Sequence, residues 1–552
     1  MEQGMTAAPR RRPPARAAWA STVAAGALAL AALLAVPGTA QARTPPDQLI
    51  IGMSMNNLLS LDPAAATGND VVEIAANLYD YLVELDPDDL TRVMPGLAER
   101  WEIAPDGRTI TLTLREGVVF HSGNAVTAED AAWSLRRVLK LNLALATAWK
   151  SYGFSAANVG DLIHANDART LVIRLPRATD PKLVLYTLAT SVSAVVIDRQ
   201  TVLAHEKNGD LGHAWLTTRA AGSGAFRLDE WRAKDVLLMS RFERYWRGAP
   251  PLRRVVMRHM TESQALRLMI ERGDIDVATG MSVPDIQALR GTPGLHTESV
   301  QRGTLYYAAV SAKSGPFADR RVRQALRSLI DYQGINTTIM PNYGVLHQRP
   351  VQRGLAATLP EPGYTLDVAG ARQLLAEAGY PQSFKTTIRV LAESPFINIA
   401  TSLQATLARA GIEAAILPGT GNQVYGAMRE RKFDIIVGRG GGGAEPHPHS
   451  SLRALVYNPD NRDEARLTNF QGWRTSFYSP GLNARIEQAV TLVDPQAQTA
   501  MYQDIQREYD QEVGAIFPIS QMQDTVVLAD DLRNYRGHPA VTTRYRDVHK
   551  QR

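Results

Sequence analysis

Residues 386–438 alternate short apolar runs with amphipathic ones, and this stretch decides the fold. In order it contains "TTIRVL" (386–391), "INIATSLQATLARAG" (397–411), "IEAAIL" (412–417), "GNQVYGAMRERKF" (421–433) and "DIIVG" (434–438). The first, third and fifth segments are short and apolar, as in buried strands, whereas the second and fourth have helical periodicity. A βαβαβ order predicts a mostly parallel sheet covered by helices. Ligands of such sheets bind beyond the carboxyl ends of the strands, so the residues after the last strand lie on the predicted ligand side.

A glycine-rich run follows the last of these strands directly. Five of the six residues at 438–443 are glycine, and "AEPHPH" (444–449) comes next. A phosphate-binding loop is disfavoured, because no Gly-Lys-Ser/Thr follows and the two prolines resist a helix. Glycine also lets a ligand or another strand approach backbone N–H and C=O groups closely, which suits a peptide-like solute. A flexible connector is the alternative, but the position after a parallel strand favours ligand binding. The candidate glycines are Gly438, Gly440, Gly441 and Gly442.

Two histidines, His447 and His449, follow this run two residues apart. On a strand, both side chains would point the same way and could share a metal ion. Pro448 separates them, however, and the segment has the composition of a loop. The pattern therefore favours two solvated loop histidines, and the pair is kept as the alternative metal site. No cofactor is predicted.

The composition bounds the class of protein. A length of 552 residues predicts two or three domains, and 45% apolar with 21% charged residues is typical of a globular protein. The chain has no cysteine, which excludes disulfides, thiolate nucleophiles and cysteine-ligated zinc. No G-x-S-x-G or H-E-x-x-H motif occurs and no pair of acids stands out, so no enzyme is predicted.

The N-terminus has the organisation of a signal peptide. Four arginines within residues 10–16 precede an apolar stretch at 17–36, a Pro-Gly break and an Ala-Gln-Ala site at 40–42. We predict cleavage after Ala42, which places the mature chain in the periplasm. An uncleaved membrane anchor is the alternative, because the apolar stretch nearly reaches spanning length. The leader holds four Arg and one Glu, or +3 of the formal +5, and leaves +2 on the mature chain, so no nucleic-acid binding is predicted.

Further elements are marked by caps and by periodicity. Thr127 and Asp130 predict a capping-box start to a helix, and Asp367 and Gly379 mark the start and stop of another. "RTITLTL" (108–114) and "TLVIRL" (170–175) alternate as half-buried strands do. One apolar stripe at helical spacing consists of Val322, Ala325, Leu326, Leu329 and Ile330.

The order of these segments resembles one family, the dipeptide-, oligopeptide- and nickel-binding solute-binding proteins of ABC transporters. The similarity runs from about residue 50 to the C-terminus. It is carried by "LDPAAATGNDVVEIAANLYDYLVELD" (61–86), "MPGLAERWEIAPDGRTITLTLREGVVFHSGNAVTAEDAAWSL" (94–135), "GSGAFRLDEWRAKDVLLMSRFERYWRGAP" (222–250), "GDIDVA" (273–278), "GPFADRRVRQALRSLID" (315–331) and "ARQLLAEAGYP" (371–381).

The resemblance implies an α/β periplasmic-binding-protein fold of two lobes. Crossing strands would form the hinge, the ligand cleft would lie between the lobes, and the first lobe would carry an extra domain. The implied boundaries are 1–42 for the signal peptide, 43–73, 190–305 and 520–552 for the first lobe, 74–189 for the extra domain, and 306–519 for the second lobe.

The resemblance also implies a function. The protein would be a monomer that captures a peptide-like or other polar small solute and delivers it to an ABC permease and its ATPase in the inner membrane. A sensory or chaperone-like binding role is an alternative, and a secreted hydrolase is disfavoured. The implied ligand contacts are Gly438, Arg439, Gly440, Gly441, Gly442, Glu445, His447, Met55, Asn56, Tyr425 and Trp473.

One position departs from the family pattern. Peptide-binding members carry an aspartate, three residues before an Asp/Glu-Pro pair, that binds the ligand's α-ammonium. Glu445-Pro446 matches the pair, and Gly442 stands where the aspartate is expected, which disfavours peptides with a free N-terminus. Arg439 replaces a frequent aromatic residue and could hold a carboxylate or phosphate. Pro446-His447 resembles nickel-binding members, so a metal chelate held by His447 and His449 is the alternative solute.

Overall fold

The computed structural model describes residues 43–66, 68–361, 363–382, 384–441, 445–540 and 542–551. Thr44–Arg552 forms one compact unit. The predicted signal peptide (1–42) and Gly442 lie outside the described residues. None of the described helices is both long and apolar enough to cross a membrane.

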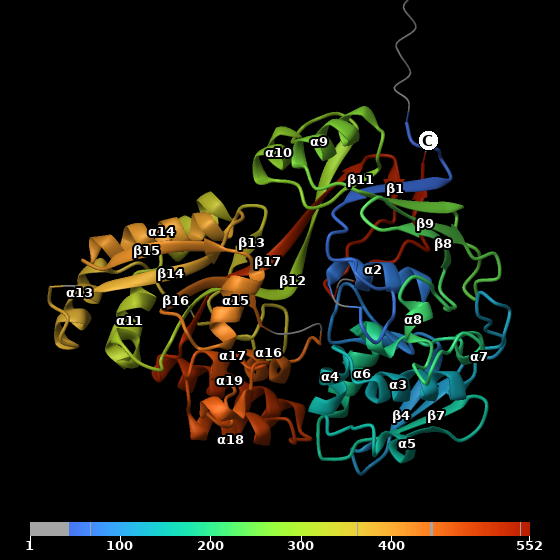
Figure 1. The fold of residues 1–552 in the computed structure, drawn as a ribbon, viewed down its shortest axis with the longest axis horizontal. Coiled ribbons are helices and arrows are strands. Elements are labelled where there is room, and N and C mark those ends of the chain that lie inside the picture. The colour runs from blue at the N-terminus through green and yellow to red at the C-terminus, as the bar shows by residue number, and fades with distance from the viewer. Residues whose placement is uncertain are drawn as a thin grey trace, which may run out of the picture. The chain divides into compact units, whose positions relative to one another are not determined.

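A long antiparallel pair of strands runs through the centre of the protein. β12 (Leu295–Val310) and β17 (Ile516–Ala529) are neighbours in an eleven-stranded sheet of order β15-β14-β16-β12-β17-β11-β1-β10-β9-β8, with β13 (Gly344–Leu346) also on β17. Figure 1 shows the pair passing from the side of β14 to the side of β1. The two strands therefore belong to both lobes, as expected for a crossing-strand hinge.

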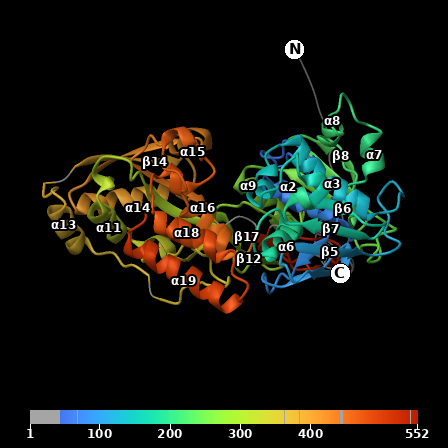
Figure 2. The same cartoon turned by 90° about the horizontal axis from the view of Figure 1, so that it is seen from below.

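The second lobe contains the predicted βαβαβ block. Its elements are β14 (Lys385–Leu391), α14 (Phe396–Arg409), β15 (Glu413–Gly419), α15 (Gly421–Arg429) and β16 (Ile435–Gly440). β14 pairs in parallel with both β15 and β16, which confirms the prediction of a parallel sheet. α14 and α15 pack on β14 and β15 (Figure 2). The last strand runs on through Gly440, two residues beyond the expected end, and pairs with β12.

The first lobe is built on a strand near the start of the described chain. β1 (Gln48–Met53) pairs in parallel with β10 (Arg254–His259) and with β11 (Val277–Ala278), and β9 (Val236–Arg241) and β8 (Phe226–Arg232) extend the sheet.

A separate four-stranded sheet lies beside it. The order is β4 (Ala98–Ile103), β5 (Thr109–Leu114), β7 (Thr170–Arg174) and β6 (Ile163–Ala165). α3 (Ala128–Leu141) contacts β6 and β7 and begins with the predicted capping box of Thr127 and Asp130. The strands predicted at 108–114 and 170–175 are therefore confirmed.

The remaining elements are short or lie around these sheets. The helices are α2 (Asn69–Leu78), α4 (Ala146–Ser151), α5 (Val159–Leu162), α6 (Pro181–Thr190), α7 (Arg199–Leu203), α8 (His213–Leu216), α9 (Ser263–Arg272), α10 (Val283–Ala288), α11 (Arg320–Ser328), α12 (Tyr332–Gly334), α13 (Val368–Glu377), α16 (Pro448–Leu455), α17 (Gln471–Arg474), α18 (Pro480–Ala489) and α19 (Pro495–Gln511). The short strand pairs are β2 (Val83–Leu85) with β3 (Val93–Pro95), and β18 (Leu532–Arg533) with β19 (His549–Lys550). Asp367 caps α13, and Gly379 after it has a positive φ, as predicted.

The hydrophobic core divides into clusters that follow the sheets. The largest consists of residues between 305 and 519 and fills the region predicted as the second lobe. It includes the whole predicted apolar stripe, whose last two residues, Leu329 and Ile330, lie just beyond the end of α11. A second cluster surrounds α3 and the four-stranded sheet, but it also recruits Ala64, Val490 and Ala540 from outside 74–189. The predicted domain boundaries stay a prediction.

A buried ion pair ties the four-stranded part to the first lobe. The guanidinium of Arg137, on α3, donates to both carboxylate oxygens of Asp62 at 2.7 and 2.8 Å, and neither side chain is exposed. Burial raises the pKa of Asp62, but the hydrogen bonds and charge of Arg137 outweigh it and hold the pKa below its usual range.

We expect Arg137→Ala to lower the free energy of unfolding by about 3–5 kcal/mol, because it leaves a buried carboxylate without its cation. Arg136→Ala is the matched control: Arg136 pairs with the half-exposed Glu129, and its loss should cost below about 1 kcal/mol. Urea unfolding of both variants measures the difference. The gap between wild type and Arg137→Ala should narrow below about pH 4, because an ionised Asp62 stabilises the fold only above its depressed pKa. Equal losses in the two variants would contradict the assignment.

Candidate functional site

The crossing strands are irregular where they pass between the lobes. Gln301 pairs with Gln523, but the next paired residue on β12, Leu305, faces Gln521. Residues 302–304 therefore stand opposite a single residue and leave the hydrogen-bonded ladder. Such bulges re-aim side chains, and they occur preferentially at sites of function.

Two buried glutamines hold the bulge in place. Gln521 donates its side-chain amide to the carbonyl of Arg302 at 3.0 Å, and Gln352 donates to the carbonyl of Gly303 at 2.7 Å. Gln352 in turn accepts a hydrogen bond from the buried hydroxyl of Ser451. Carbonyls that lose their strand partners thus gain side-chain donors, as buried polar groups require.

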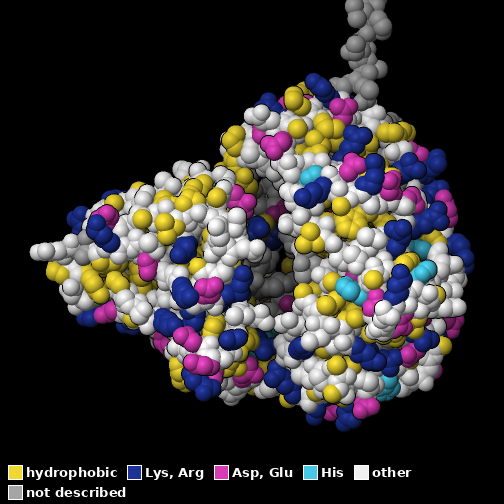
Figure 3. Space-filling view, viewed as in Figure 1, with side chains coloured by type: hydrophobic (Ala, Val, Ile, Leu, Met, Phe, Trp, Pro, Cys, Tyr) yellow, Lys and Arg dark blue, Asp and Glu magenta, His cyan; other side chains and the backbone are white. Residues whose placement is uncertain are grey.

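Arg302 lines two cavities, which include residues of both lobes. The Glu445 cavity, of about 300 Å³, is lined by Leu85, Pro87, Asp88, Asp89, Leu90, Gln301, Arg302, Gly303, Gln352, Arg353, Gly354, Leu355, Glu445, Pro446, Gln521, Pro539 and Ala540. The Asp70 cavity, of about 260 Å³, is lined by Ile51, Met53, Ser54, Asp70, Glu73, Thr279, Gly280, Met281, Ile286, Val300, Arg302, Asn342, Tyr343, Gln523, Asp524, Thr525, Val526, Tyr535, Gly537 and Thr543. The surface is hollowed where the crossing strands pass between the lobes (Figure 3). We take the two cavities together as the candidate site.

Charged groups give the two cavities different character. The guanidinium of Arg302 donates to Asp524 at 2.6 Å and to the carbonyl of His538. Burial raises the pKa of Asp70, and burial also raises the pKa of Glu73, which accepts a hydrogen bond from the Tyr545 hydroxyl. In the other cavity burial raises the pKa of Glu445. Carboxylates so placed favour a proton or a cationic partner.

The glycine run lies differently from the expectation. Gly438, Arg439 and Gly440 are strand residues of β16, opposite Tyr307, Tyr306 and Leu305 of β12. Of Gly438, Gly440 and Gly441, the glycines of this run that the structure describes, Gly441 has a positive φ of 97° and the other two do not. None of these four residues lines either cavity. The run therefore lets a neighbouring strand and side chains approach closely, and the predicted contact of these residues with solute stays a prediction.

Tyr425 and Arg439 belong together. The backbone N–H of Arg439 donates to the Tyr425 hydroxyl at 3.0 Å, and that hydroxyl donates to the carbonyl of Arg439 at 3.3 Å. The Arg439 side chain is exposed, with its guanidinium 5.8 Å from the centroid of the Phe396 ring.

Three other candidates lie apart from the cavities. Trp473 is buried, donates to the carbonyl of Arg462 at 3.0 Å and carries the Arg431 guanidinium over its ring. Met55 is buried in the first-lobe core, and Asn56 is exposed beside it. Their neighbours Met53 and Ser54 line the Asp70 cavity, and the predicted contact of Met55, Asn56 and Trp473 with solute stays a prediction.

The two histidines are not solvated loop residues, and that prediction was wrong. His447 and His449 are only 4% and 6% exposed, and α16 begins at Pro448 with His447 as its cap. Proline suits the first position of a helix, because its missing N–H would have had no helical partner. From sequence alone, the same proline indicates only a break in a helix.

The histidine pair is also poorly placed to hold a metal ion. His447 accepts from the backbone N–H of His449 at 3.1 Å through Nδ1, and its Nε2 lies 3.3 Å from Asp180. Both of its ring nitrogens therefore face protein partners. Across the described residues, no group of three or more histidine or acidic side chains could hold a metal ion.

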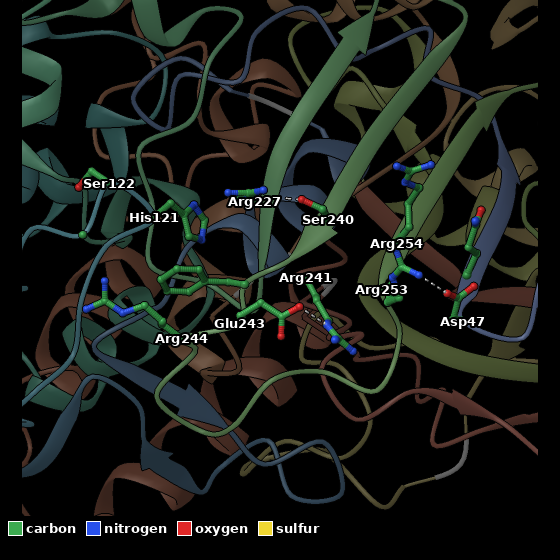
Figure 4. A pocket seen from close by; sticks show the side chains of 13 residues that line it. Asp47, His121, Ser122, Arg227, Ser240, Arg241, Glu243, Arg244, Arg253 and Arg254 are labelled. Atoms are coloured by element: carbon green, nitrogen blue, oxygen red, sulfur yellow. Dashed lines mark hydrogen bonds and ion pairs between the residues drawn. The ribbon is translucent and has the colours of Figure 1, made fainter.

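A further cavity, of about 500 Å³, lies elsewhere, on the sheet edge of the first lobe (Figure 4). Arg227 points to Ser240, Arg241 to Glu243, and Arg253 to Asp47. It receives no side chain from residues 306–519, the predicted second lobe. It therefore has no part in a site that two lobes could close.

Comparison with known proteins identifies the family. The family model described as bacterial extracellular solute-binding proteins, family 5 Middle, matches residues 92–463. The chain belongs to this family. It is a family of binding proteins, which agrees with the expectation from the sequence.

Relatives of full length support the assignment. The probable D,D-dipeptide-binding periplasmic protein DdpA of Escherichia coli (strain K12) is 25% identical over 487 residues, which cover 85% of this chain and 87% of the relative. The glutathione-binding protein GsiB of Salmonella typhi is 27% identical over 475 residues, covering 82% and 85%. The solved structure of the periplasmic binding protein DppA from Helicobacter pylori, in complex with the peptide STSA, is 20% identical with a TM-score of 0.75, covering 92% of this chain and 98% of that one. The fold is thus the two-lobed α/β fold predicted.

We expect Gln352→Ala to disturb the bulge. It removes the donor of the Gly303 carbonyl and the acceptor of Ser451, and unpaired buried polar groups cost about 1–3 kcal/mol each. Gln333→Ala, at an exposed position on α12, should change the free energy of unfolding by less than about 0.5 kcal/mol. Denaturant titration of the two variants measures this. A loss in Gln352→Ala no larger than in the control would show that the glutamine does not support the bulge.

Proposed function

We propose that the protein is the solute-binding component of an ABC importer and captures a peptide-like or other polar small solute between its lobes. The observation that carries this is the position of the two cavities. They flank strands shared by both lobes, and their walls come from the first lobe, the predicted extra domain and the second lobe. A closing movement of the lobes would enclose whatever fills them.

The crossing strands supply the hinge. Beyond the bulge, β12 and β17 pair regularly from Leu295 to Gln301 and again from Leu305 onward, with one further register shift between Tyr306 and Tyr307. Closure by rotation of two rigid parts needs only a few residues to change backbone angles, and 302–304 have no ladder bonds to break. The change is conformational, and no covalent step is required.

The relatives suggest the class of solute. DdpA and GsiB are named for a D,D-dipeptide and for glutathione, both peptide-like compounds. Within that class we propose a solute without the free α-amine that family members bind from the loop. Gly442 stands at that position, and Glu445, the nearby acid, lines its cavity from the second lobe.

The permease, its ATPase and the export of the chain belong to the same proposal. The signal-peptide pattern at 1–42 supports a periplasmic location. Neighbouring genes for two permease subunits and an ATPase would support delivery to an importer. An isolated gene beside an unrelated pathway would weaken it.

A fluorescence experiment tests capture directly. The chain has no cysteine, so Leu59→Cys and Val493→Cys, at positions 78% and 93% exposed, take a donor and an acceptor dye cleanly. The solute retained by protein from its native host, identified by native mass spectrometry and added back, should change energy transfer at micromolar concentration. The control carries the same two dyes on a Leu59→Cys, Asn208→Cys double variant. Both positions lie in the predicted first lobe, so energy transfer between the dyes should not change when solute binds. Binding without any change in transfer between the lobes would contradict closure.

A further inference from the structure

Three carboxylates converge on the Asp70 cavity. Asp70 and Glu73 lie three residues apart on α2, so their side chains project from the same face of the helix. Asp524, on β17, completes the group. All three belong to the cavity wall, and the charge of Asp524 opposes the ionisation of both Asp70 and Glu73.

The protein compensates only part of this charge. Among the described residues that line the cavity, Arg302 is the one cation, and it donates to Asp524 at 2.6 Å. Glu73 receives the hydroxyl of Tyr545, which carries no charge. Three carboxylates and one guanidinium leave a formal charge of −2 on the wall of the cavity.

A second observation also indicates a ligand. The side chain of Asn342 is 5% exposed and lines the same cavity from the second lobe. Arg290 donates to its carbonyl oxygen at 3.2 Å, which fixes the orientation of the amide, and the amide nitrogen has no hydrogen-bond partner. A buried amide N–H without an acceptor is costly, so an acceptor atom from outside the chain would satisfy it.

We propose that the Asp70 cavity binds a small organic cation, an amine or a guanidinium, whose charge is met by Asp70 and Glu73 and whose carbonyl or carboxylate oxygen accepts from Asn342. The inference rests on the proposed function and names the solute's charge. It also means that the first lobe recognises the positive charge of the solute. The loop after β16 cannot do so in the family's manner, because glycine stands where peptide-binding members carry the anchoring aspartate.

A comparison with another buried acid indicates that the cation for Asp70 and Glu73 comes from outside the chain. Burial raises the pKa of Asp70 and of Glu73, and for Glu73 the charge of Arg302 offsets the rise only in part. By contrast, Glu84 lies within reach of Arg544 and Arg546, and its pKa falls to about 2 despite burial. Glu84 thus has arginine partners within the chain, whereas no ion pair joins Asp70 or Glu73 to a basic side chain among the described residues.

The test uses cations and their neutral counterparts of nearly equal shape. Isothermal titration calorimetry with the full mature chain compares 4-guanidinobutanoate with 4-ureidobutanoate, and 6-aminohexanoate with heptanoate, none of which carries an α-amine. At least one cation should bind at least tenfold more tightly than its counterpart. Asp70→Asn and Glu73→Gln should each weaken the binding of that cation at least tenfold and remove the preference for it over its neutral counterpart. Both substitutions keep side-chain shape and relieve repulsion, so the thermal midpoint without solute should stay equal or rise.

Glu262→Gln is the matched control, because it removes the same charge from an exposed position outside the cavity and should leave the preference intact. The inference is overturned if none of the cations binds, if cations and neutral counterparts bind alike, or if the preference survives in both cavity variants. A neutral or anionic solute retained from the host would also overturn it while the proposed function stands. If no solute of any charge changes energy transfer between the lobes, the proposed function itself fails.

Discussion

The antiparallel pairing of β12 with β17 is the constraint on which the rest of the structure depends. Both strands belong to one sheet that runs through the whole described unit, so neither lobe is complete without them. On the second-lobe side, β12 is buried from Leu305 to Val310 between β16 and β17. Toward the first lobe, β17 joins β11, which pairs with β1. A movement of the lobes must therefore be absorbed within these two strands.

The bulge at 302–304 reconciles a continuous sheet with such a movement. A regular ladder would resist bending, because each residue fixes its partner, whereas a bulge releases several residues at once. Gln352 and Gln521 then replace the lost backbone partners with side chains that adapt more easily. The same release turns Arg302 toward both cavities. Hinge and binding wall are thus built from the same residues.

Local patterns predicted the fold well, whereas the walls of the two cavities lay beyond their reach. The βαβαβ block, the capping box at Thr127 and the cap at Asp367 depend on residues close in sequence, and periodicity encodes them. The cavity walls depend on residues hundreds of positions apart, such as Asp70, Asn342 and Asp524, and no local pattern brings them together. The bulge at Arg302 had one weak indication in the sequence, because Gly303 follows Arg302 inside a strand-like run. His447 was misjudged because Pro448 was weighed as a breaker and not as a first helical residue.

The negative charge of the Asp70 cavity would make closure of the two lobes depend on the charge of the solute. Asp70 and Glu73 belong to the predicted first lobe and Asn342 to the predicted second, so closing the lobes would take water away from carboxylates whose charge Arg302 compensates only in part. That desolvation opposes closure of the empty protein, since a buried charge is costly unless paired. A cationic solute removes the penalty and contributes its own contacts, and a ligand shifts a conformational equilibrium only by such a difference between states. An apolar cleft would favour closure even without solute, because closure buries apolar surface. An acidic cleft would instead stay open until a cationic solute pairs with its carboxylates.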